Sequence, residues 1–320
     1  MPSNSQQDLS VVLVTGSYDH EIRFWEAWSG ICSRTITRNE PGQINRLAIS
    51  PDKRLLAAAI HKRIFVYEVA GTSSSPLVAF EGAEGHTNNV TAVSFHPEGK
   101  WVVSGSEDGT IRIWDLRTSH LYRKFENGAP VNDVVIHPNQ GELISCDQAG
   151  VIRQWDLAEN ACTLELAPGD IPIRSISVAF DGSCLVAGNN KGRVYVWKIN
   201  DESSGLPRFE AVTKFQAHQK YLTRCLLSPD VRLLATCSAD TTVKIWSIGP
   251  DYQYRLEKTL KGHQRWVWDA AFSADSAYLV TASSDHVARL WELASGETVR
   301  QYNGHHKAAV CVALNDVNLA

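Results

Sequence analysis

Short stretches of alternating apolar and polar residues recur along the whole chain, separated by turns rich in glycine, aspartate and asparagine. In one example, VTAVSFHP (90–97) is followed by the turn EGK and by WVVSGS (101–106). After the turn EDG come TIRIWDL (110–116) and LYRKF (121–125). Alternation with a period of two is typical of β-strands that bury one face. The pattern therefore predicts repeated groups of four short strands.

The third strand of each group ends in an aromatic residue. The seven aromatic residues are Trp25, Tyr67, Trp114, Trp155, Trp197, Trp246 and Trp291. They follow one another at steps of 42, 47, 41, 42, 49 and 45 residues, which is the repeat length of a WD40 propeller blade. We therefore predict an all-β fold, a seven-bladed WD40 β-propeller.

The two ends of the chain hold incomplete repeats. VVLVTGS (11–17) reads as a second strand, and AAVCVALND (308–316) reads as a first strand with nothing after it. Pairing the two would close the ring and remove an open sheet edge, which is a template for aggregation. We predict one propeller over residues 1–320, closed by overlap of the C-terminal strand with the N-terminal blade. Residues 1–9 are expected to form a flexible tail.

A histidine, a hydroxyl residue, an aspartate and a tryptophan recur at constant spacing. The sets are His86, Ser104, Asp108 and Trp114; His218, Thr236, Asp240 and Trp246; His263, Thr281, Asp285 and Trp291; and His305 with Thr15, Asp19 and Trp25. Hydrolases use similar Ser-His-Asp triads. Repeated copies in one chain instead favour buried hydrogen-bond networks that hold turns in place. We therefore predict structural networks, no catalytic residue and no enzyme activity.

Three repeats depart from this pattern. His61, Ala149 and Lys191 occupy the aspartate position in the second, fourth and fifth repeats, and no Gly-His pair precedes them. We expect packing alone or other polar pairs to hold these blades, and we expect them to be the softer part of the ring.

The first strand of a propeller blade lines the central channel. Near its start each such strand has an apolar residue that we call its anchor, and the residues on either side of the anchor should reach the channel mouth. The expected anchors are Ile44, Val90, Val131, Ile173, Leu222, Val267 and Val310. One sector beside them is aromatic, and rigid aromatic side chains at a rim are favoured anchors of protein interfaces. Alternatively, the indoles fold back to fill the channel wall. The residues predicted to bind a partner are Trp266, Trp268, Tyr221, Gln43, Asn45 and Arg174.

Net charge, cysteine spacing and the absence of known motifs argue against several classes of protein. A net charge of -4 argues against a protein that coats nucleic acid or a polybasic membrane anchor. The seven cysteines form no C-x-x-C pair, so we predict small buried side chains in a reducing compartment, with no disulfide frame and no metal site. No cofactor motif, secretory signal or bilayer-length apolar run is visible. These features predict a soluble intracellular protein.

Several stretches go beyond generic repeat residues. They include GSYDHEIRFWEAWSGICSRT (16–35), VTASSDHVARLWE (280–292) and SGETVRQYNGHHKAAVCVALND (295–316). Together they resemble the G-protein β-subunit-like WD-repeat subunits of target-of-rapamycin (TOR) kinase complexes. The resemblance runs from about Leu13 to the C-terminus. The WVW motif at 266–268 and Gln43 within GQIN match that family's pattern.

The resemblance implies a non-catalytic scaffold that binds and stabilises the kinase domain of TOR in TOR complexes 1 and 2. It implies TOR kinase and, through it, the other complex subunits as partners, with no nucleic acid and no direct membrane insertion. It also implies a cytoplasmic protein with peripheral association to endomembranes and the vacuole or lysosome surface. Other hypotheses remain for a propeller. One is a WD40 substrate receptor or adaptor of a ubiquitin ligase, and another is an enzyme that uses the channel.

Overall fold

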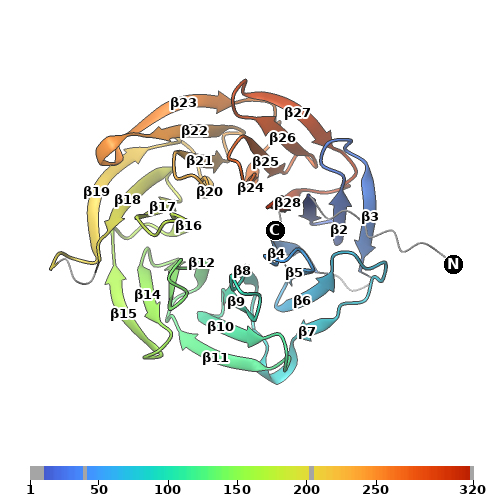
Figure 1. The fold of residues 1–320 in the computed structure, drawn as a ribbon, viewed down its shortest axis with the longest axis horizontal. Coiled ribbons are helices and arrows are strands. Elements are labelled where there is room, and N and C mark those ends of the chain that lie inside the picture. Colours follow the sequence, from blue (N-terminus) through green and yellow to red (C-terminus); the bar gives the residue numbers. More distant parts are fainter. Residues whose placement is uncertain (1–10, 39–41, 202–204, 318–320) are drawn as a thin grey trace.

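Each predicted group of four strands forms one antiparallel sheet, and seven such sheets surround a central channel (Figure 1). The computed structural model describes residues 11–38, 42–201 and 205–317. This confirms the predicted all-β, seven-bladed propeller. The expected tail at residues 1–9 lies outside the described residues and stays a prediction.

The strands of each blade run from the channel outward. Blade 1 holds β28 (Ala309–Asn315), β1 (Val12–Ser17), β2 (Glu21–Trp25) and β3 (Cys32–Thr37). Blade 2 holds β4 (Ile44–Ile49), β5 (Leu55–Ile60), β6 (Arg63–Glu68) and β7 (Val78–Phe80). Blade 3 holds β8 (Val90–Phe95), β9 (Trp101–Ser106), β10 (Thr110–Asp115) and β11 (Leu121–Glu126). Blade 4 holds β12 (Val131–Ile136), β13 (Glu142–Asp147), β14 (Ile152–Asp156) and β15 (Ala161–Leu166).

The remaining blades follow the same order. Blade 5 holds β16 (Ile173–Val178), β17 (Cys184–Asn189), β18 (Arg193–Ile199) and β19 (Phe209–Gln216). Blade 6 holds β20 (Leu222–Leu227), β21 (Leu233–Ser238), β22 (Val243–Ile248) and β23 (Tyr254–Leu260). Blade 7 holds β24 (Val267–Phe272), β25 (Tyr278–Ser283), β26 (Ala288–Glu292) and β27 (Glu297–Tyr302). In the described part of the chain, the 3-10 helices η1 (Gly82–Glu84) and η3 (Pro250–Tyr252) lie between blades 2 and 3 and within blade 6. None of the helices in the described residues is long and apolar enough to cross a bilayer.

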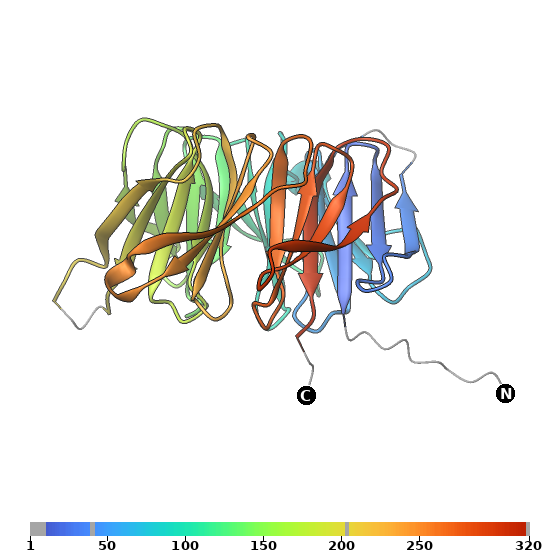
Figure 2. The same cartoon turned by 90° about the horizontal axis from the view of Figure 1, so that it is seen from above.

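The ring closes as the incomplete repeats predict. Strand β28 from the C-terminal end pairs antiparallel with β1, with Val12 opposite Asn315. The edge-on view shows the two strands side by side (Figure 2). Trp25 then packs against Tyr302 of blade 7, with ring centroids 5.6 Å apart. Blade 1 is therefore built from both ends of the chain.

A β-bulge follows the anchor of the inner strand in the blades. The register shifts between Ile44 and Arg46, for example, and between Val267 and Asp269. A bulge inserts one residue and turns the following side chains toward the opposite face. The buried side chains in β4 are accordingly Ile44 and Leu47, three residues apart, where strict alternation would separate them by two.

The register corrects one expected anchor. Ser17 pairs with Ala309, which follows His305 by four residues, as Val90 follows His86. Ala309 is fully buried, whereas Val310 lines the channel mouth. The anchor of β28 is thus Ala309, and the prediction of Val310 was wrong. That prediction favoured the larger side chain over the four-residue spacing from His305.

Neighbouring blades touch closely through small residues on the second strands. A Cβ atom on Gly105 would lie 2.7 Å from the Val131 side chain of the next blade, so only glycine fits there. The equivalent register position in four other blades holds a fully buried alanine or cysteine: Ala59, Cys146, Cys237 and Ala282. Five of the seven cysteines are buried, Cys32 is half-buried and Cys162 is exposed. All seven carry free thiols.

Candidate protein-binding site

The repeated His, hydroxyl, Asp and Trp residues meet in buried networks. In blade 3, the Nδ1 atom of His86 lies 2.9 Å from Asp108, and its Nε2 atom lies 2.8 Å from the Ser104 hydroxyl. The indole of Trp114 donates to the same hydroxyl at 2.9 Å. Burial lowers the pKa of His86 despite the hydrogen bond to Asp108, so the ring is neutral at pH 7. Its Nδ1–H donates to Asp108, and the Ser104 O–H donates to Nε2.

The same bonds form in blades 6, 7 and 1. The histidine–aspartate distances are 2.7 Å for His218–Asp240, 2.9 Å for His263–Asp285 and 3.0 Å for His305–Asp19. The histidine–hydroxyl distances are 2.9 Å for His218–Thr236, 2.8 Å for His263–Thr281 and 2.8 Å for His305–Thr15. The indoles of Trp246, Trp291 and Trp25 donate to these hydroxyls. Every one of the hydroxyl residues is fully buried, so none is presented to a substrate.

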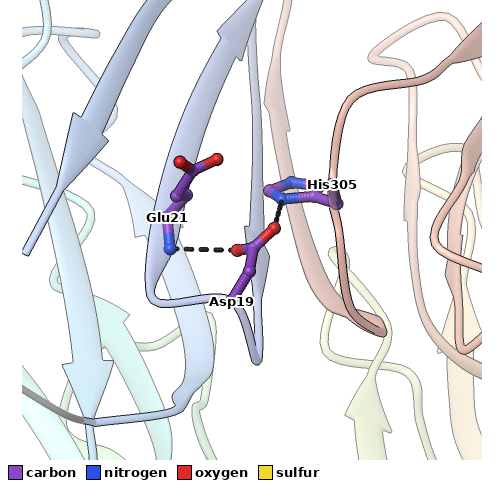
Figure 3. A group of neighbouring side chains, drawn as sticks. All are labelled: Asp19, Glu21 and His305. Atoms are coloured by element: carbon purple, nitrogen blue, oxygen red, sulfur yellow. Dashed lines mark hydrogen bonds and ion pairs between the residues drawn. The ribbon is translucent and has the colours of Figure 1, made fainter.

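In blade 1 the network spans the closure of the ring. Asp19 accepts from the His305 side chain and from the backbone N–H of Glu21 (Figure 3). Asp19, Glu21 and His305 could be mistaken for metal ligands, since their ligand atoms lie within 4.8 Å of one another. The Glu21 carboxylate, however, pairs with Arg23 at 2.7 Å. The group therefore belongs to the structural network.

Blade 4 contains a substitute network. Asn127 lies four residues before Val131, the position that histidine holds elsewhere. Its amide nitrogen donates to Asp147 at 3.1 Å, and its amide oxygen accepts from Ser145 at 3.0 Å. Trp155 donates to Ser145 at 2.9 Å. Blade 4 is thus held by other polar pairs, one of the two expected alternatives, and the signal was the spacing of Asn127 from its anchor.

Blades 2 and 5 have no hydroxyl ten residues before their aromatic residue. Ala57 and Ala187 hold that position. The hydroxyl of Tyr67 instead receives a hydrogen bond from Arg38 at 3.1 Å. The expected softness of these blades stays a prediction.

The networks predict a pH dependence of stability. Burial alone would raise the pKa of Asp285, but the hydrogen bond and charge of His263 and two backbone N–H groups outweigh it and lower the pKa to about 2. The unfolded chain therefore takes up this proton first as the pH falls. The stabilisation is complete above about pH 4 and is lost as the pH falls through about 2.

We expect the urea midpoint of the wild type to fall between pH 6 and pH 3, and Asp285→Asn to reduce that fall. The exposed loop residue Asp170 supplies the control, Asp170→Asn, which should leave the fall unchanged. An equal fall in the wild type and in Asp285→Asn would show that Asp285 does not contribute.

The predicted aromatic residues form one stack. Tyr221 and Trp266 stack with ring centroids 5.8 Å apart and planes 22° apart, and Trp266 contacts Trp268 at 5.2 Å. We call these three residues the aromatic sector. They lie at the face that carries the turns between second and third strands, because the Ser284 N–H donates to the Trp266 carbonyl.

The two indoles have different surroundings. Trp266 is 42% exposed, although it is a large apolar side chain. Trp268 is half-buried, donates to the Ser284 hydroxyl at 2.6 Å and packs against the apolar cluster between blades 1 and 2. The two sequence interpretations each describe one indole. Trp268 folds back to fill the channel wall and supports Trp266, and Trp266 faces solvent as an interface residue would.

A polar cavity of about 150 Å³ adjoins the aromatic sector at the channel mouth. Trp268 forms one part of its wall, and Gln43, Asn45 and Arg174 also line it. We call this cavity the polar pit. The structure thus brings five of the six predicted residues to one continuous surface around the pit and Trp266, with Tyr221 stacked on Trp266 at its edge.

Asn45 also has a structural role. Its amide donates to the carbonyl of Val90, the anchor of the next blade, at 3.0 Å. Equivalent bonds run from Thr91 to Val131, from Asn132 to Ile173 and from Thr223 to Val267. A residue directly after the anchor therefore ties adjacent blades together, and the Asn45 amide nitrogen already donates one hydrogen bond inside the propeller.

Four charged residues below the pit meet across the channel, and the sequence interpretation missed them. Arg46 lies 3.1 Å from Asp269 and 3.7 Å from Asp133. Arg224 lies 2.7 Å from Asp133 and 3.3 Å from Asp269. We call Arg46, Asp133, Arg224 and Asp269 the charge quartet. All four stand two residues after their anchors, and this shared position was the available signal.

The quartet also reaches the backbone of neighbouring blades. Asp133 accepts from the N–H of Ile176, and Asp269 accepts from the N–H of Val312 on the closing strand. Both carboxylates are almost completely buried. Pairs with several additional hydrogen bonds are the kind of buried ion pair that a fold tolerates. The quartet therefore fastens blades 2, 4, 6 and 7 to one another through the channel.

Comparisons with known proteins agree with this architecture. The WD domain, G-beta repeat model matches residues 76–115, 119–156, 209–247 and 254–292. The target of rapamycin complex subunit wat1 of Schizosaccharomyces pombe is 62% identical over 97% of both chains. The target of rapamycin complex subunit LST8 of Saccharomyces cerevisiae is 57% identical over 97% of this chain and all of its own length. The LST8 subunit of Bos taurus is 42% identical over 96% of this chain and 95% of its own.

The chain belongs to the LST8 family. The similarity to LST8 proteins extends over all seven blades, whereas each WD-repeat match runs from an outer strand to the third strand of the following blade. None of those matches includes Trp25, Tyr67 or Trp197, which are the aromatic residues of blades 1, 2 and 5. Blades 2 and 5 are also the blades in which alanine replaces the network hydroxyl.

Proposed function

We propose that this LST8-family chain is a non-catalytic scaffold subunit of TOR complexes 1 and 2 that binds and stabilises the kinase domain of TOR. Through the kinase it meets the other subunits and supports nutrient and growth signalling. The relatives that carry the name of TOR complex subunits support the assignment to the complex. The exposed Trp266 on its rigid support is the single observation that carries the binding surface.

The physical argument for binding rests on the aromatic sector. A large exposed indole is costly in water, and its burial against a partner stabilises the complex. Trp266 is held between Tyr221 and Trp268, so little side-chain freedom is lost when a partner docks. Tryptophan is also among the residues most enriched in interface hot spots. These features favour a protein partner at the channel mouth.

The state of the polar networks supports the non-catalytic role. The recurring hydroxyl groups are buried and already hydrogen-bonded, so they cannot approach a substrate carbonyl or phosphate. The proposed location is the cytoplasm, with peripheral association to endomembranes and the vacuole or lysosome surface through the complex.

Affinity purification of the tagged chain from cells tests the proposal. We expect TOR kinase to co-elute, and we expect depletion of the chain to lower the activity of each TOR complex per kinase molecule. Recovery of a ubiquitin-ligase core in place of the kinase would contradict the proposal and favour the adaptor hypothesis. Unchanged kinase activity after depletion would contradict the stabilising role.

A further inference from the structure

Arg174 departs from the pattern of its structural equivalents. It directly follows the anchor Ile173, as Asn45 follows Ile44. Four residues at this position donate to the anchor carbonyl of the next blade. Arg174 makes no such bond to Leu222, and within residues 11–38, 42–201 and 205–317 its guanidinium has no hydrogen bond or ion pair. The blade-to-blade ring therefore does not use this side chain.

The polar pit contains one arginine that forms no ion pair within the described residues. Its charged lining residues are Arg46, Glu107 and Arg174. Arg46 is paired with Asp269 and Asp133 in the charge quartet. Glu107 accepts a hydrogen bond from the Asn89 amide at 3.0 Å. Outside the charge quartet the pit therefore carries one cation, Arg174, and one anion, Glu107, and no ion pair joins them within the described residues. Arg174 is also close enough to oppose the burial-driven rise in the pKa of Tyr18 across the channel.

A second donor in the pit is also unpaired. The side-chain amide of Gln43 has no hydrogen bond within the described residues. A guanidinium and a primary amide both donate to planar oxygen pairs, and arginine binds carboxylates through two parallel bonds. The volume of about 150 Å³ is well below the about 300–1,000 Å³ of pockets that hold drug-sized ligands. The pit thus suits a single side chain from a docked protein.

We infer that the polar pit receives the carboxylate of one aspartate or glutamate from the kinase segment that docks on the aromatic sector. The inference rests on the proposed function. Because Trp268 lines the pit and contacts Trp266, an apolar side chain on Trp266 and an acidic side chain in the pit can belong to one short segment. Arg174 supplies the charge, and Gln43 supplies a second donor.

Binding of full-length TOR kinase to purified variants of the chain tests this inference at 0.1 M and 0.5 M salt. We expect Arg174→Gln to weaken binding about tenfold at low salt, as loss of a charge-assisted hydrogen bond should. The deficit should shrink at high salt, because the pit is open to screening ions. Arg174→Lys should restore part of the affinity. The control Arg255→Gln, on the outer strand β23, should bind like the wild type.

The outcomes separate this inference from the proposed function. If Trp266→Ala loses the kinase but Arg174→Gln binds like the wild type at both salt concentrations, the carboxylate is excluded and the scaffold proposal stands. If Trp266→Ala and Arg174→Gln both bind the kinase like the wild type, the pit and the aromatic sector are both excluded as the interface. If phosphatase treatment of the kinase removes the dependence on Arg174, the anion is a phosphate and the assignment to aspartate or glutamate is wrong.

Discussion

Replacing Trp266 and Trp268 together with alanine is expected to abolish recovery of the TOR kinase while the propeller stays folded. Hot-spot tryptophans contribute at least about 2 kcal/mol each, so the double variant should bind on the order of 1,000-fold more weakly. Trp266 supplies exposed area, and Trp268 supplies its support. Pull-down of the endogenous kinase, with circular dichroism and thermal melting of each purified variant, measures both properties.

The matched control is Trp28→Ala. Trp28 is 54% exposed and lies in the turn between β2 and β3. Hairpin turns alternate between the two ends of the strands, so this turn lies on the face opposite the turn between β25 and β26. Trp266 lies at that second turn, because its carbonyl accepts from the Ser284 N–H. We expect Trp28→Ala to recover the kinase normally. A folded double variant that still binds the kinase would place the interface elsewhere on the ring.

The single variants separate binding from folding. Trp266→Ala removes a side chain with much of its surface in water, so it should lose kinase binding with little change in melting temperature. Trp268→Ala removes a packed indole and its bond to Ser284, so it should also lower the unfolding free energy by about 1–2 kcal/mol, less than a fully buried tryptophan would. If Trp266→Ala alone fails to fold, the exposed indole is part of the core and the binding hypothesis fails.

Asp269→Ala is expected to lower the free energy of unfolding by about 3–5 kcal/mol, the usual cost of leaving buried charges unpaired. The change removes a counter-ion from both Arg46 and Arg224. It also removes the acceptor for the N–H of Val312 on the strand that closes the ring. Urea unfolding of the purified chain measures the loss.

Two comparisons make the result specific to the quartet. The exposed control Asp170→Asn should change the free energy of unfolding by no more than about 0.5 kcal/mol. Replacing all four quartet residues with apolar residues of similar volume should cost less than Asp269→Ala, because no unpaired charge is then left behind. If Asp269→Ala stays within about 1 kcal/mol of the wild type, the quartet does not fasten the ring.

Much of this architecture could be derived without a structure. The seven aromatic residues and their spacing predicted the blades, and the incomplete ends predicted the pairing of β28 with β1. The histidine spacing predicted which side chains share a network. The histidine spacing did not reveal Asn127, because blade 4 has an asparagine at the network position that histidine holds in four other blades. Val310 was misassigned because the larger side chain was preferred over the four-residue spacing from His305.

Features that repeat within about 45 residues could be derived from the sequence: strand alternation, turns, anchors and network spacing. Those features depend on local backbone geometry and on the adjacent blade, so they are visible as a period. Three other features depend on the tertiary structure: which indole faces solvent, the lack of an ion pair at Arg174 within the described residues, and which charges meet in the channel. Arg46 and Asp269, for example, are 223 positions apart in the chain. Ring closure and the bulge bring such residues together, and neither their distance nor their burial is encoded in any single repeat.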